Sequence, residues 1–220
     1  MKTEERVEQY VCFICDILGI FEPEAILYDS PNEQVRFKLD ENGLVDPDDY
    51  LLCLPSVEKI EAERVFHFLC IAHELRHVYQ AQQYINYLEG GIGEVDSYTL
   101  NEIQTIGADL NDRKNLIEGG LSPKNTKGYN RRFMEIDANA YGATIMLELF
   151  DIGIVRFEND AIDEKDLMET NHLIIERESE VLSQFDDMRE EYVICTSIHD
   201  YDLEEMRGWL RKETSKYNLH

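Results

Sequence analysis

The sequence is poor in basic residues and has no long apolar run. Lysine and arginine together number 21 against 46 aspartates and glutamates in 220 residues, so the formal net charge is −25. This balance repels phosphate backbones and anionic lipids, which argues against direct nucleic-acid binding. The charged residues 1–6 lead into no apolar segment long enough for a signal peptide or a membrane span. We therefore predict a cytoplasmic protein that binds neither nucleic acid nor a membrane.

The cysteines do not indicate a disulfide framework. They number five, an odd count, and four of them lie in apolar runs as reduced core thiols do. Cys12 and Cys15 form a C-x-x-C pair, but no second pair and no following histidine accompany it. We interpret both as core residues and not as a redox or metal site.

The H-E-x-x-H motif formed by His73, Glu74 and His77 lies in a helix predicted over residues 57–87. Residues four apart lie one above the other on a helix, so the two histidines can direct ring nitrogens at one point. Such a pair suits a tetrahedral zinc ion, Zn2+. Glu74 lies about 100° around the helix and can reach a water on that metal. The motif therefore predicts a zinc site with Glu74 as proton acceptor.

A motif this short also occurs by chance, and the alternative interpretation is an exposed, charged helix face. Residues 65–72 are nearly all apolar, which predicts that the helix is buried where the histidines begin. Two histidines and a glutamate buried without partners would cost several kcal/mol. A bound metal would remove that cost, so we favour the metal site.

A catalytic zinc usually has three protein ligands and a water, so the two histidines leave the site incomplete. Our candidate for the third ligand is Glu135, on a second helix predicted over residues 131–150. Small residues are dense along that helix and would let it approach the first one closely. Asn139 shares the face of Glu135, whereas Asp137 points about 200° away. Four other carboxylates remain as alternatives: Glu94, Asp96, Glu102 and Asp109.

The two motifs together resemble those of the ImmA/IrrE-like zincin metallopeptidases, which phages and mobile elements often encode. That family reads H-E-x-x-H and then E-x-x-A-(N/D)-x-F-A, and residues 135–141 read E-I-D-A-N-A-Y. The resemblance covers about residues 25–150. It implies a helical gluzincin-like core with a small sheet. It also implies the zinc ligands His73, His77 and Glu135, with Glu74 as general base.

The sequence departs from the family pattern at three places. His77 and Glu135 are 58 positions apart, longer than we expect for that family, so an insertion loops out or Glu135 is not the ligand. Tyr141 and Gly142 replace phenylalanine and alanine. Arg76 stands where the family often has glycine.

The predicted fold class is α+β, a mostly helical zincin-like core with a small antiparallel three-stranded sheet and C-terminal helices. Periodicity predicts a helix over residues 4–18 that ends at Gly19. Three β-type runs then form an antiparallel meander, and a further helix is expected in the middle of the chain. The predicted segments are 25–28, 35–39 and 50–54 for the strands and 98–110 for the helix.

Two parts are predicted: residues 1–150 form the metallopeptidase core, and the acidic helical residues 151–220 pack on it. In the second part, apolar residues repeat at a spacing of seven, which indicates a long helix packed along one seam. A last helix is predicted over residues 202–212. The repeating residues are Leu167, Ile174, Val181 and Met188.

The leading functional hypothesis is a cytoplasmic zinc metallopeptidase that acts on a protein or peptide substrate. An extended substrate is expected to add to the edge of the strand at 50–54. One alternative is a regulatory or binding protein that keeps the zincin fold and acts through its acidic C-terminal helices. Another is a metal-dependent hydrolase of a different bond. The sequence leaves the identity of the substrate and the oligomeric state open.

Overall fold

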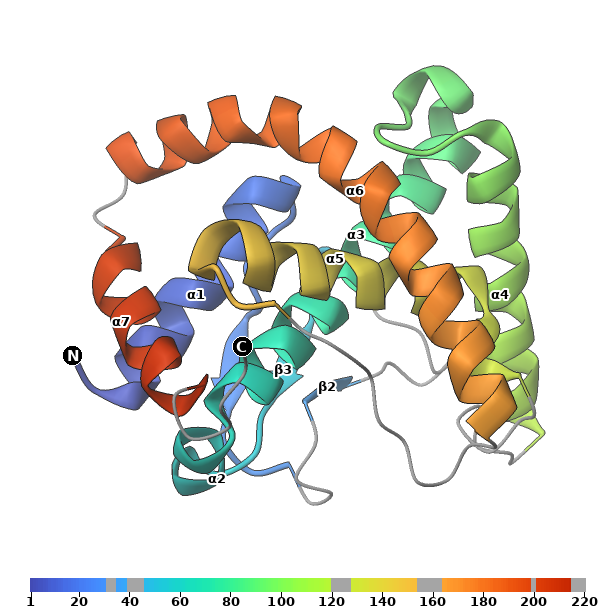
Figure 1. Ribbon diagram of the computed structural model, residues 1–220. Helices are drawn as coiled ribbons and strands as arrows, with labels where there is room; N and C mark the ends of the chain where they lie inside the picture. Colours follow the sequence, from blue (N-terminus) through green and yellow to red (C-terminus); the bar gives the residue numbers. More distant parts are fainter. Residues whose placement is uncertain (31–34, 39–45, 120–127, 154–163, 199–200, 215–220) are drawn as a thin grey trace.

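The computed structural model describes residues 1–30, 35–38, 46–119, 128–153, 164–198 and 201–214, without side-chain detail at 38, 164, 184–198 and 214. It confirms the predicted class, a mostly helical α+β fold with a three-stranded sheet (Figure 1). The helices are α1 (Thr3–Leu18), α2 (Val57–Ala62), α3 (Arg64–Gly90), α4 (Leu100–Glu118), α5 (Phe133–Phe150), α6 (Glu164–Ile198) and α7 (Leu203–Thr214). The strands are β1 (Ala25–Leu27), β2 (Arg36–Lys38) and β3 (Leu51–Cys53), and two 3-10 turns are η1 (Ile92–Glu94) and η3 (Tyr129–Arg131).

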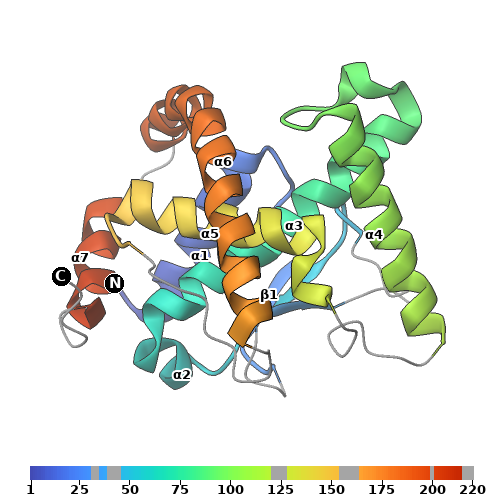
Figure 2. The same cartoon turned by 45° about the vertical axis from the view of Figure 1, so that its right-hand side comes forward.

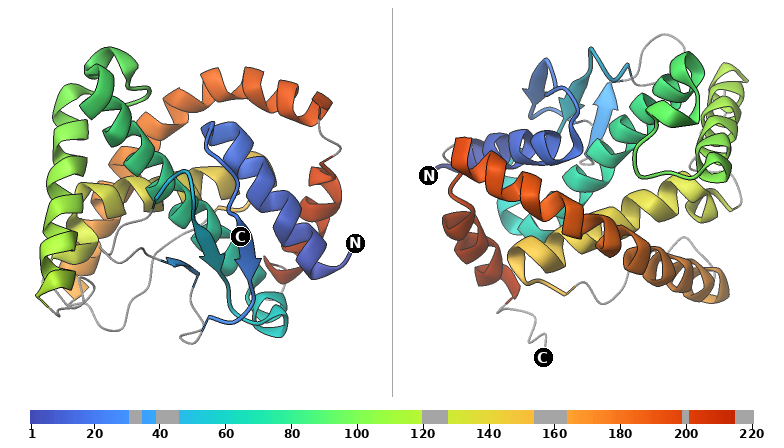
Figure 3. Two further views of the ribbon diagram at one scale, coloured as in Figure 1. Left: turned by 180° about the vertical axis from the view of Figure 1, so that it is seen from behind. Right: turned by 90° about the horizontal axis from the view of Figure 1, so that it is seen from above.

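Helices α3 and α5 lie side by side at the centre of the molecule. Seen from behind, the sheet and α1 lie in front of α3, while α6 crosses α5 on the opposite side (Figures 2 and 3). Helix α4 lies at one end of this arrangement and α7 at the other (Figure 1). The apolar core is continuous through these layers and includes Leu52, Phe68, Ile71 and Ile145, all fully buried. None of the described helices combines the length and apolar composition needed to cross a bilayer.

The order of the strands differs from the predicted antiparallel meander. The sheet order is β1-β3-β2, with β3 antiparallel to β2 but parallel to β1. The chain reverses at each connection as predicted, but β3 takes the central place and is more buried than β1, with Leu52 fully buried. Both edges of β3 are therefore paired, and the prediction that a substrate adds to the strand at 50–54 is wrong.

The long helix predicted over residues 57–87 is two helices, because the backbone leaves helical geometry at Glu63 (φ −133°, ψ 54°). Ser56 accepts a hydrogen bond from the Lys59 N–H and caps α2. The first turn of α3 is capped from α7, since the Val65 N–H donates to the buried carboxylate of Glu213 at 2.8 Å. A negative charge at a helix N-terminus is favourable, so Glu213 of α7 stabilises the start of α3 at this position.

Helix α7 also binds the C-terminal end of α5. Arg207 donates from Nε to the Leu149 carbonyl at 2.9 Å, and Arg211 donates from Nε to the Phe150 carbonyl at 3.1 Å. These carbonyls lack partners within their own helix, and cations are favourable at a helix C-terminus. Helix α7 therefore complements the end of each central helix with the opposite charge.

The seam predicted for the C-terminal part is present where side chains are described. Ile174 and Val181 of α6 are buried, whereas Met188 lies outside the described side chains. The last helix occurs where predicted, and its apolar residues Leu203, Met206 and Leu210 are buried. Both helices thus contribute side chains to the same core as residues 1–150.

Asp137 of α5 is fully buried and joins three helices through its carboxylate. Oδ2 accepts from Arg76 Nε of α3 at 2.9 Å and from the Tyr98 hydroxyl at 2.7 Å, and Oδ1 accepts from Arg177 Nε of α6 at 2.8 Å. Burial raises the pKa of Asp137, but Arg76, Arg177 and the Tyr98 hydrogen bond outweigh burial and hold it below its usual value. The carboxylate is therefore charged, and it neutralises guanidinium groups that are themselves buried.

We expect Asp137→Asn to be strongly destabilising, because it leaves Arg76 and Arg177 without their buried counter-charge. The loss in the free energy of unfolding should be about 3–5 kcal/mol. Glu180→Gln is the matched control, since it removes an exposed partner of Arg177 and should cost less than about 1 kcal/mol. Urea denaturation followed by circular dichroism measures both. Equal losses for the two variants would contradict this assignment.

Candidate metal centre

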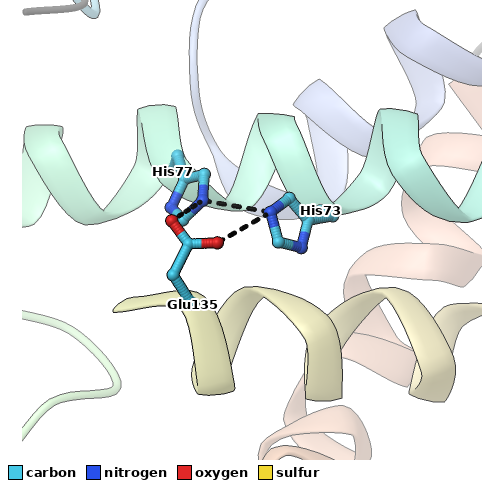
Figure 4. Close-up of side chains that lie close together, drawn as sticks. All are labelled: His73, His77 and Glu135. Carbon is cyan, nitrogen blue, oxygen red and sulfur yellow. Dashed lines mark hydrogen bonds and ion pairs between the residues drawn. The ribbon is translucent and has the colours of Figure 1, made fainter. Parts of the chain in front are cut away.

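His73 and His77 lie one turn apart on α3, and Glu135 lies in the first turn of α5, opposite them (Figure 4). The close approach of the two helices depends on Gly142 of α5. A Cβ there would lie 3.0 Å from the Leu69 carbonyl oxygen, so an alanine would require the backbone of α3 to shift by a few tenths of an ångström. Gly142, one of the small residues predicted to allow a close contact, thus lies at that contact.

The three side chains converge on one point. The Nε2 atoms of His73 and His77 are 3.1 Å apart, and each lies 3.6 Å from a carboxylate oxygen of Glu135. Two atoms that ligate zinc at about 2.0–2.2 Å in tetrahedral geometry are themselves about 3.3–3.6 Å apart. The two nitrogen–oxygen distances match this spacing and the nitrogen–nitrogen distance is slightly shorter, so a small shift of one ring lets the three groups hold a tetrahedral cation. Among the described residues, they are the group of potential metal ligands that the structure brings together.

Hydrogen bonds on the far side of each ring determine which nitrogens carry protons. Gln80 donates through Nε2 to the Met134 carbonyl at 3.1 Å and to Asp137 at 2.9 Å, so its Oε1 must face His77. That oxygen is 2.7 Å from His77 Nδ1, which therefore carries the proton. His73 Nδ1 lies 2.8 Å from Asn139 Oδ1. An amide oxygen can only accept, so this ring nitrogen also carries the proton.

Both Nε2 atoms consequently present lone pairs toward the Glu135 carboxylate. Three acceptors that face one another at these distances repel unless a cation or proton lies among them. A divalent metal satisfies all three at once, and the amide oxygens behind the rings are the kind of outer partner that orients metal-bound histidines. The donor set of two imidazoles and a carboxylate suits zinc.

The protonation states also suit metal binding. Burial lowers the pKa of His73 and of His77, and the proximity of His77 lowers the pKa of His73 further. Burial raises the pKa of Glu135, but His77, His73 and a hydrogen bond from Tyr129 outweigh it and bring that pKa below its usual value. At neutral pH the site therefore holds two neutral rings and a carboxylate. His73 keeps 15% of its side chain exposed, the most of the three, so the site opens on its side.

Glu74 and Tyr129 border the same site. The negative charge of Glu74 raises the pKa of His73 against the larger effect of burial, and it adds to the effect of burial on the pKa of Tyr129. Glu74 is half-buried, as a residue that exchanges protons with solvent or substrate must be. The Tyr129 hydroxyl hydrogen-bonds the Glu135 carboxylate and so orients the candidate ligand.

The structure resolves the alternatives that the sequence left open. The chain between His77 and Glu135 includes the rest of α3 and all of α4, and the two residues still meet. Arg76 is fully buried, so the alternative of an exposed helix face is wrong. Of the fallback ligands, Glu102 binds Thr99 and Arg177 instead. Asp109 accepts the Met134 N–H, and Glu94 and Asp96 do not join the cluster of potential ligands.

Sequence reasoning placed Asn139 beside the ligands but missed Gln80. The signal for Gln80 was available, since it lies three residues after His77 on the same helix face. Nothing in the sequence indicated that Arg113 lies near the site, where its charge acts on His77 and Glu135. Arg113 belongs to α4, and residues 120–127 separate that helix from the second motif, so no regular spacing connects the two.

Comparison with known proteins adds no relative. No family model matches the sequence, and neither the curated proteins nor the solved structures contain a match. The interpretation of the site therefore depends on its geometry and on the two motifs.

We expect Gln80→Ala and Asn139→Ala to weaken zinc binding about 10- to 100-fold, as loss of outer hydrogen bonds to metal-bound histidines generally does. Gln82→Ala is the matched control, because Gln82 is on the same helix but bonds Asn86. Competition with a chromogenic chelator measures the affinities. The assignment fails if all three variants bind zinc as the parent does.

The depressed pKa values of His73 and His77 predict the pH dependence of zinc binding. Both rings stay largely neutral even below the usual histidine pKa of 6.5, so affinity should change little between about pH 8 and 6.5 and fall only as the pH passes through the lowered pKa values. The stability of the metal-free protein should change with pH in the same direction. The contribution of the two neutral rings is fully present above about pH 6.5 and is lost as the pH falls through the folded-state pKa values. Chelator competition across this range tests it, and a loss of affinity that begins near pH 7.5 would contradict it.

Proposed function

We propose that the protein is a zinc-dependent metallopeptidase of the zincin type. His73, His77 and Glu135 hold the metal, and Glu74 is the general base. The observation that supports this most directly is the convergence of three lone-pair donors, supplied by the H-E-x-x-H helix and by the helix of the second motif, at 3.1–3.6 Å. The resemblance of the two motifs to ImmA/IrrE-like metallopeptidases supports the choice of a peptide bond as the target.

Bound zinc would supply a Lewis acid that polarises a carbonyl and makes a bound water acidic near neutral pH. The chain supplies the proton transfers. Glu74 accepts the proton of the attacking water and delivers it to the leaving amine. Gln80 and Asn139 keep both rings in the tautomer that leaves Nε2 free to ligate, and Tyr129 holds the Glu135 carboxylate.

An extended peptide can bind by adding to a sheet edge, and in the described sheet these edges belong to β1 and β2. In strand β2, Phe37 is buried and the side chain of its neighbour Arg36 is partly exposed. The positive charge of Arg36, in a chain whose net charge is −25, would attract an acidic substrate segment. This location replaces the central strand that the sequence had indicated.

Glu74→Gln should separate the peptidase from a binding protein with the same fold. The variant keeps the ligands, so we expect zinc affinity within about threefold of the parent and a loss of peptide cleavage of at least about 10³-fold. Cleavage is measured by mass spectrometry on a mixture of casein-derived peptides, with purified zinc-loaded protein.

Two further variants complete the experiment. His77→Ala should lose both zinc and cleavage, and Glu89→Gln, at the exposed end of the same helix, should lose neither. If the parent and Glu74→Gln cleave at equal rates, Glu74 is not the base. A parent that binds zinc but cleaves no peptide would favour the regulatory alternative.

A further inference from the structure

Arg113 of α4 is a cation beside the candidate metal site of a strongly acidic chain. Burial is the largest influence on the pKa of His77, Tyr129 and Glu135, and the positive charge of Arg113 pulls all three pKa values down. Arg113 thus acts on two candidate ligands and on the tyrosine that orients one of them. The proposed reaction assigns it no role.

The contact between α4 and α5 determines the position of Arg113. Asp109 accepts the backbone N–H of Met134, in the first turn of α5, at 3.4 Å. Arg113 follows Asp109 by four residues and therefore shares its face of α4. That face is directed at the turn of α5 from which Glu135 reaches the histidines. The guanidinium consequently lies at the α4 side of the site.

The Nε–H of Arg113 is buried and has no hydrogen-bond acceptor within the described ranges. Nearby carboxylates have other donors, because Asp112 pairs with Arg132 and Glu135 accepts from Tyr129. A buried donor without an acceptor loses its hydrogen bond to water and gains none in return, and folded proteins generally avoid this. Among the residues that the structure describes, the geometry leaves this donor available to a further acceptor.

We propose that Arg113 binds a carboxylate of the substrate beside the scissile bond, so that the protein prefers anionic peptides. A guanidinium matches a carboxylate through paired, charge-assisted hydrogen bonds. The carboxylate comes either from a free C-terminus or from an aspartate or glutamate side chain. This inference depends on the proposed peptidase function for the identity of the ligand, but not for the existence of the anion site.

The test measures peptide binding in the zinc-loaded Glu74→Gln background, where peptides are not cut. The probes are N-acetyl-trialanine and its C-terminal amide, and N-acetyl-Ala-Asp-Ala-amide and its asparagine analogue, titrated by ligand-observed NMR. We expect at least one carboxylate probe to bind more tightly than its neutral analogue. Arg113→Gln should weaken that probe by about 10- to 100-fold and leave the neutral analogue unchanged.

Two further variants make the result specific. Arg113→Lys should keep part of the preference, because it keeps the charge but not the paired hydrogen bonds. Lys114→Gln is the matched control, since that neighbouring cation pairs with Glu118, and it should change nothing. The probe that loses affinity identifies the source of the carboxylate.

Three results would overturn the inference: no preference for either carboxylate probe, an equal loss on charged and neutral probes, or an Arg113→Gln variant that only gains zinc affinity. The last would show that Arg113 merely offsets the charge of Glu135. Failure of the peptidase proposal is a separate observation. A parent protein that cuts none of the probes it binds would remove the peptidase, while Arg113-dependent carboxylate binding would stand.

Discussion

The buried carboxylate of Asp137 is the interaction on which the arrangement of the helices depends. It binds Arg76 of α3 and Arg177 of α6 from its own place on α5, and all of these contacts lie out of solvent. The same carboxylate accepts a hydrogen bond from Gln80, whose other end faces His77. One charge therefore holds three helices together and also determines the tautomer of a candidate ligand. A substitution of Asp137 would therefore affect both the packing of the helices and the candidate metal site.

Contacts at the ends of α3 and α5 also hold these two helices in place. Helices α3 and α5 are antiparallel, so the start of α3 and the end of α5 meet at α7, which binds them through Glu213, Arg207 and Arg211. The start of α5 lies at the opposite end, and Glu135 occupies its first turn, where the helix dipole favours a negative charge. The carboxylate that faces the two histidines is thus stabilised by its place in the helix as well as by its partners.

The sequence was sufficient to predict features that depend on local spacing. The helix ending at Gly19, the two helices of the site and the meeting of His73, His77 and Glu135 all follow from periodicity or motif. Features decided by distant contacts could not be predicted. The break before α3 depends on Glu213, 148 positions away, and the central place of β3 depends on which strand buries best.

We propose that two imidazoles and one carboxylate, from helices far apart in the sequence, bind one zinc ion. X-ray absorption at the zinc K-edge of the metal-loaded protein tests it most directly. The account predicts one zinc per chain, with scattering from two imidazoles and from oxygen at about 2.0–2.2 Å, and the loss of one oxygen neighbour in Glu135→Ala. Sulfur scattering near about 2.3 Å, or a spectrum that Glu135→Ala leaves unchanged, would contradict it.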